Sequence, residues 1–80
     1  MEPFTAEQLV EMEMEQRELV AVLQLNLEQV QEWRIERAGV KIGTLRYNTY
    51  GHSWHAILSS GQTAGDDLIS CINAIEGAGR

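Results

Sequence analysis

Histidine and cysteine, the usual ligands of zinc, are few in this chain and are poorly spaced for that role. His52 and His55 are three positions apart in a segment with strand composition, and residues three apart in a strand point to opposite faces. The two imidazoles cannot bind one zinc ion together unless the chain bends there. A third ligand from Cys71 or Asp66 has no other support. The sequence therefore predicts no metal and no cofactor.

Motifs for catalysis and phosphate binding are also missing. The glycines that a phosphate-binding loop would need are scattered, at Gly43, Gly51, Gly61 and Gly65. No Ser/His/Asp or Cys/His arrangement has a recognisable context, and 80 residues leave little room to enclose a substrate pocket. We therefore expect a protein that is not an enzyme.

Carboxylates are the reactive groups that the sequence does concentrate. Residues 1–37 hold nine glutamates and three arginines, so the whole net charge of −6 lies there, and residues 38–80 sum to zero. An acidic surface repels nucleic acid and anionic lipid and attracts basic protein surfaces. The candidate partner-binding residues are Glu7, Glu11, Glu15, Glu18, Glu28, Glu32 and Glu36.

One helix-start signature occurs twice, 21 residues apart, and predicts the elements that carry these carboxylates. Phe4–Leu9 and Leu25–Val30 share the order apolar, cap, any residue, Glu, Gln, apolar. In each copy the cap, Thr5 or Asn26, accepts a backbone N–H, and the glutamine reaches back to the cap. We expect two helices that meet at a tight corner, Ala6–Leu23 and Leu27–Arg37.

The first predicted helix has two apolar stripes, although a surface helix needs only one. We expect the core to receive Leu9, Met12, Leu19, Val20 and Leu23. The second stripe predicts a dimer contact through Val10, Met14, Ala21 and Leu25. The alternative is a helix sandwiched between the hairpin and the last helix. A chain this short buries only about 60–65% of its unfolded surface, which also favours a homodimer.

The corner Leu23–Asn26, with Val30 and Trp33 after it, resembles the helix-turn-helix unit of small transcriptional regulators. The resemblance covers about 20 residues, and it implies DNA binding with the following hairpin as a wing. Gln24 stands where those families usually carry glycine. The exposed face of the second predicted helix carries Glu28, Glu32 and Glu36, which would face phosphates. A DNA-binding regulator is therefore the alternative function, and we expect no nucleic acid to bind.

The rest of the chain predicts a β-hairpin and one helix. Val40–Tyr47 and His52–Leu58 are rich in β-branched and aromatic residues, and Gly43 interrupts the alternation, which predicts a bulge. The last helix should begin near Thr63 or Asp66 and end at Gly77. Its buried stripe is predicted to be Leu68, Cys71, Ile72 and Ile75.

The predicted fold is a single α+β domain over residues 1–80 with the element order ααββα. Residues 1–37 form the acidic helical pair, residues 38–58 the β-hairpin, and residues 59–80 the loop and the C-terminal helix. A single cysteine excludes an internal disulfide. The N-terminus lacks a signal-peptide plan, and the longest apolar run has five residues, far short of a membrane span. We expect a cytoplasmic protein without membrane contact.

These observations favour a non-enzymatic, acidic interaction domain that binds or inhibits a larger, partly basic protein. Small acidic proteins of this kind are common among phage and mobile-element regulators. The identity of the partner does not follow from the sequence.

Overall fold

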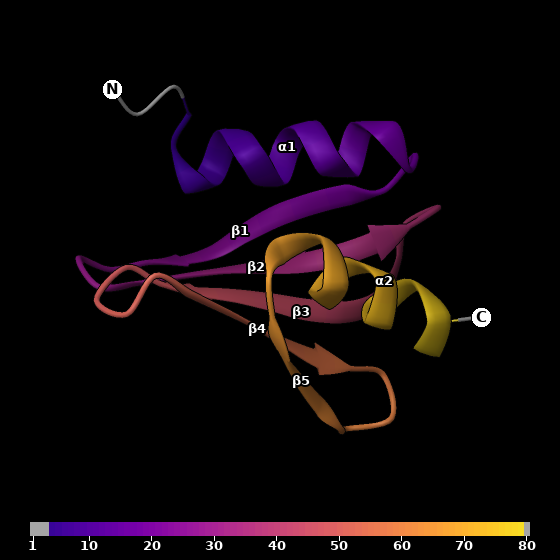
Figure 1. Ribbon diagram of the computed structural model, residues 1–80. Helices are drawn as coiled ribbons and strands as arrows, with labels where there is room; N and C mark the ends of the chain where they lie inside the picture. Colours follow the sequence, from indigo (N-terminus) through magenta and orange to yellow (C-terminus); the bar gives the residue numbers. More distant parts are fainter. Residues whose placement is uncertain (1–3, 80) are drawn as a thin grey trace.

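The computed structural model describes residues 4–79 and has a five-stranded antiparallel sheet with one helix over the middle of a face and the other running along an edge strand (Figure 1). Met1–Pro3, Arg80 and the side chain of Asp66 lie outside the described part. The strands follow one another across the sheet in sequence order, so β1 and β5 are its edges. The elements are α1 (Ala6–Gln16), β1 (Val20–Asn26), β2 (Val30–Arg37), β3 (Val40–Asn48), β4 (Ser53–Leu58), β5 (Thr63–Asp66) and α2 (Leu68–Ala78).

The predicted order ααββα is wrong, because residues 20–37 form two strands and not the end of one helix and the whole of another. The segment Glu32–Glu36 alternates polar and apolar side chains. On a helix Trp33 and Ile35 would point about 200° apart, but on a strand both face the same side. Both are buried in the core. The alternation of apolar and polar side chains with a period of two therefore favours a strand for this segment, which forms β2.

The second helix-start signature is a hairpin turn. Asn26 ends β1, and its Oδ1 accepts a hydrogen bond from Gln31 Nε2 at 3.1 Å. Leu27 N donates to Val30 O at 2.8 Å and closes the turn between β1 and β2. Residues 38 and 39 form the hairpin turn between β2 and β3. Ala38 and Gly39 have φ values of 51° and 81°, and positive φ at both central residues is what a type I′ hairpin turn requires.

The first helix-start signature is confirmed. Thr5 Oγ1 accepts from Gln8 N at 3.2 Å, and Gln8 Oε1 accepts from Thr5 N at 2.9 Å, which completes a capping box. The helix ends at Gln16 and not at Leu23, because Glu18 adopts a left-handed backbone with a φ of 57°. This reversal sends the chain back along the sheet as β1.

The predicted hairpin and last helix are confirmed in type. β3 pairs with β4, and the register of β2 and β3 shifts beside Gly43, where the bulge was expected. The last helix begins later than predicted, at Leu68, because Thr63–Asp66 pairs with β4 as an edge strand. Its cap is Asp67, whose Oδ1 accepts from Ser70 N at 2.8 Å.

The core lies between the sheet and the two helices. Helix α2 packs on β3, β4 and β5, and α1 packs on β1. A Cβ on Gly43 would lie 2.7 Å from Ile75 Cγ2, so α2 lies directly on the middle of the sheet. The largest fully buried side chains are Trp33, Ile35, Leu45, Ile72, Ile75, Val10 and Cys71.

Candidate protein-binding surface

The seven glutamates predicted to bind a partner lie in separate places. Three of them are spaced by four residues on one side of α1, and we call these the acidic row: Glu7, Glu11 and Glu15. Glu18 follows in the turn before β1, and Glu28 lies in the turn after it. Glu32 and Glu36 lie on β2, and their side chains face the side of the sheet that no described helix covers. The seven do not form one surface.

The carboxylates of the sheet form ion pairs, and within the described part of the chain those of the acidic row do not. Glu32 Oε1 lies 2.6 Å from Arg46 Nη2 on the neighbouring strand, and Glu36 Oε2 lies 2.5 Å from Arg34 Nε. Five glutamates form no ion pair within residues 4–79: Glu7, Glu11, Glu15, Glu18 and Glu28. The uncompensated negative charge therefore gathers on α1 and the two turns that flank β1.

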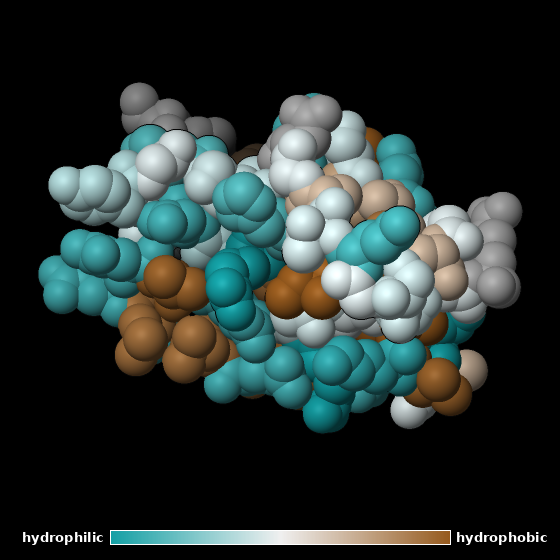
Figure 2. Space-filling view, turned by 90° about the horizontal axis from the view of Figure 1, so that it is seen from below, coloured by the Kyte–Doolittle hydropathy of each residue, from teal (hydrophilic) through white to brown (hydrophobic). Residues whose placement is uncertain are grey.

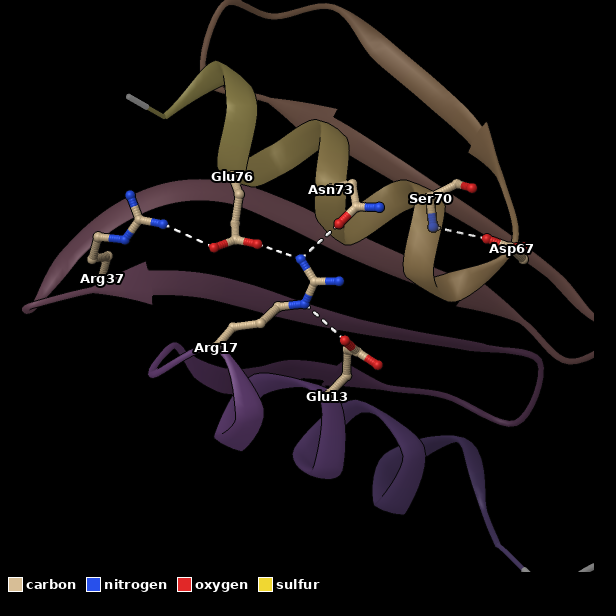
Figure 3. Close-up of polar contacts among 7 residues, drawn as sticks. All are labelled: Glu13, Arg17, Arg37, Asp67, Ser70, Asn73 and Glu76. Carbon is tan, nitrogen blue, oxygen red and sulfur yellow. Dashed lines mark hydrogen bonds and ion pairs between the residues drawn. The ribbon is translucent and has the colours of Figure 1, made fainter.

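Arg17 ties α1 to α2 and so fixes which side of α1 faces outward (Figure 3). Its guanidinium donates to Glu13 Oε2 and to Asn73 Oδ1, each at 2.7 Å, and to Glu76. The second oxygen of Glu76 accepts from Arg37 Nη2 at 3.0 Å. The hydrogen bond to Glu13 raises the pKa of Arg17, desolvation opposes that shift, and Glu76 adds to it. Glu13 is thus held towards α2, and the acidic row lies on the opposite flank of α1.

The acidic row lies beside the edge strand β1, and Figure 1 shows α1 running along that strand. A shallow groove of about 290 Å³ separates them, lined by Glu11, Met14, Glu15, Leu19, Val20 and Ala21. The strand has seven residues, and none of them is charged or a proline. Among the described residues no strand pairs with its outer edge. An uncharged strand edge beside a row of carboxylates is the most distinctive surface of this domain.

The residues predicted to form a dimer contact lie largely inside the domain. Val10 and Met14 are 0% and 2% exposed in the core, Ala21 packs against it, and Leu25 is half-buried in β1. Leu9 and Met12, expected in the core, are 38% and 43% exposed. The core stripe is predicted from a helix that includes Leu19, Val20 and Leu23. In the structure these three residues follow the end of α1. Val10 and Met14 therefore have no surface to offer to a second chain.

Helices α1 and α2 also leave a groove of about 390 Å³ between them. Its apolar lining includes Leu9, Met12, Trp54, Leu68 and Ile69. The ring of Trp54, which lines this groove, is 4.4 Å from the ring of Tyr47 between centroids. The groove continues the packing of the core to the surface of the domain.

The histidines lie on opposite sides of the sheet. His52 Nδ1 is 3.1 Å from the hydroxyl of Tyr47, on the helix side. His55 is paired in register with Arg46 on the other side. Within residues 4–79, no group of three or more His, Cys, Asp and Glu side chains is placed to hold a metal ion.

The side of the molecule opposite α1 has a mixed surface. Figure 2 views this side from below and shows hydrophobic groups that hydrophilic side chains separate. The largest of these groups lies at the end of the molecule where the β1–β2 and β3–β4 turns are found in Figure 1. In the described part of the chain, no helix is both long and apolar enough to cross a membrane.

Sequence reasoning missed the strand edge because it assigned these residues to a helix. The signal that would have found it is the pair of β-branched residues Val20 and Val22, two positions apart, with no charge between Leu19 and Leu27. The resemblance to a helix-turn-helix unit fails for the same reason. The residues that carried it form β1, a turn and β2.

Comparison with known proteins assigns this chain to no family. No family model, no curated protein and no solved structure matches it.

Proposed function

We propose that this chain is a non-enzymatic interaction domain that binds a basic protein surface through the side of the domain formed by α1 and β1. Such a domain inhibits its partner when the bound surface is one that the partner uses for nucleic acid. The cytoplasm is the compartment that fits a chain with a single cysteine.

One observation carries this proposal. Glu7, Glu11, Glu15 and Glu18 follow one another along α1 and its turn with no ion pair among residues 4–79, whereas Glu13, Glu32, Glu36 and Glu76 are all paired. Each like-charge pair at a spacing of four costs a helix about 0.2–0.5 kcal/mol. A basic partner relieves this repulsion on binding, which adds to the direct attraction between opposite charges.

The DNA-binding alternative has lost its structural basis. A recognition helix needs a second helix across a short turn, and the residues concerned form strands. The charge argument also opposes it, because tight DNA binding generally neutralises several phosphates with basic side chains. The described part of the chain has only four basic side chains besides Arg17, namely Arg34, Arg37, Lys41 and Arg46, and three of those four are in ion pairs.

The test is capture of a partner by the tagged protein from its whole native extract, at about 150 mM salt. We expect a basic protein to bind the wild type. Reversal of two carboxylates of the acidic row, Glu11→Lys with Glu15→Lys, should abolish capture. The single reversal Glu28→Lys, at an exposed turn beyond the row, is the control and should retain it.

Circular dichroism of each variant establishes that the fold is intact. Capture that survives the double reversal in a folded protein would overturn the proposal, and so would a partner without a basic surface.

A further inference from the structure

The free edge of β1 offers backbone hydrogen-bonding groups as well as charge. An edge strand presents unpaired N–H and C=O groups, and natural proteins usually protect such an edge with charged residues, with proline or by keeping the strand short. The edge strand β5 is short, with four residues. β1 has seven residues, Val20–Asn26, with no charge and no proline. The register of β1 against β2 shifts between Leu23 and Leu25, and a bulge of this kind bends an edge strand. The regular part of the edge, Val20–Leu23, is open to pairing with a further strand.

The side chains of β1 differ on its two sides. Ala21 and Leu23 share rows with buried residues on the helix side, and Val20 and Val22 share rows with Glu36 and Arg34 on the open side. Glu11 and Glu15 of the acidic row belong to α1, which packs on β1, and their groove includes Ala21 on the helix side and reaches Val20 at the start of the strand. A strand added to this edge would therefore meet carboxylates on one side and valines on the other.

Charge disfavours a second copy of this chain as the added strand. Two antiparallel edge strands are related by a two-fold axis perpendicular to the sheet, so both α1 helices would lie on the same face. The two acidic rows would then meet, in a pair of chains that each carry a net charge of −6. An added strand with positive charge avoids this repulsion.

We infer that β1 takes up an extended segment of a basic protein, which adds to the sheet as a sixth strand. Side chains alternate along a strand, so the segment has Lys or Arg at every second position, beside the acidic row, and apolar residues between them, beside Val20 and Val22. Main-chain hydrogen bonds supply affinity, and the alternating side chains supply specificity. This inference rests on the proposed function, because it specifies how the basic partner is held.

The experiment is isothermal titration with a heptapeptide of alternating lysine and valine that begins and ends with lysine. The comparison peptide has the same sequence with N-methyl groups on alternate residues, so it keeps the charge and loses half of its ladder donors. Both possible phases of methylation are used. We expect at least a tenfold weaker affinity for the methylated peptide of the phase that faces β1.

A matched pair of protein variants places the binding site. Gln24→Lys adds a charge to the exposed middle of β1, and Gln62→Lys adds the same charge in the exposed turn between β4 and β5. We expect Gln24→Lys to weaken binding of the unmethylated peptide by at least tenfold and Gln62→Lys to change it less than twofold. Circular dichroism and urea denaturation establish that both variants fold.

Three results would overturn the inference. If both methylated peptides bind as tightly as the parent, attraction to the acidic row acts without strand addition, and the proposed function survives while the inference fails. The inference also fails, and the proposed function again survives, if the unmethylated peptide does not bind although capture of the native partner still depends on Glu11 and Glu15. If sedimentation shows a wild-type dimer that Gln24→Lys dissociates, a second copy occupies the edge.

Discussion

The two ends of the chain are built from the same parts and use them differently. Residues 6–26 form a helix followed by an edge strand, and residues 63–78 form an edge strand followed by a helix. Helix α2 buries three residues, Cys71, Ile72 and Ile75, over the middle of the sheet, and its edge strand is short. Helix α1 buries two residues beside a longer edge strand and carries the acidic row. The C-terminal end packs on the middle of the sheet, and the N-terminal end has the surface that we propose for binding.

The largest effect expected from this comparison is loss of stability at α2. Ile75→Ala leaves a cavity between α2 and β3 and should lower the free energy of unfolding by about 2–5 kcal/mol, whereas Met12→Ala, at an exposed position of α1, should change it by about 0.5 kcal/mol or less. Urea denaturation measures both. Since a domain this small has little stability to lose, Ile75→Val, with an expected loss of about 0.5–1.5 kcal/mol, serves if the alanine variant does not fold. Equal losses for Ile75→Val and Met12→Ala would contradict the tight packing of Ile75 between α2 and the sheet.

The sequence was sufficient to predict elements whose local signals agree with their packing. Thr5 and Gln8 cap α1, and β3 and β4 have strand composition. Of the stripe predicted for α2, Cys71, Ile72 and Ile75 are buried and Leu68 is partly buried. It was insufficient for residues 20–37, because glutamates spaced by four lie on one side of a helix and also on one face of a strand. The spacing of Trp33 and Ile35, two residues apart, distinguishes a strand from a helix. The candidate site depended on this error, so Glu32 and Glu36 were grouped with α1 although they face the other side of the sheet.

A smaller effect is expected where the two ends meet. Arg17 of α1 and Glu76 of α2 are less than one-fifth exposed, and they join the helices. A double-mutant cycle with Arg17→Met and Glu76→Gln should give a coupling of about 0.5–1 kcal/mol, because partly exposed ion pairs are screened by solvent. The coupling should fall in 1 M salt, where screening is stronger. A coupling of zero in low salt would mean that packing alone sets the position of α1 against α2.

The smallest effect is a pH dependence confined to the start of α2. The hydrogen bond from Ser70 N–H lowers the pKa of Asp67 below its ordinary value. A lowered folded-state pKa contributes stability above the unfolded-state pKa, and this contribution is lost as the pH falls through the folded-state pKa. Asp67→Asn keeps a capping side chain and removes the titration. The variant should be less stable than the wild type at pH 7, and the difference should shrink below about pH 4. A difference that is the same at pH 7 and at low pH would contradict the role of the charge.

The central claim, that binding belongs to the N-terminal end, is tested most directly by backbone-amide NMR during titration with the alternating lysine–valine heptapeptide. We predict that the peptide shifts the amide signals of Val20–Asn26 and of the acidic row and slows amide exchange along β1. The amides of Thr63–Asp66 at the other edge should not change. Perturbations centred on β5, or on the open face around Glu32 and Glu36 with β1 unchanged, would contradict the account.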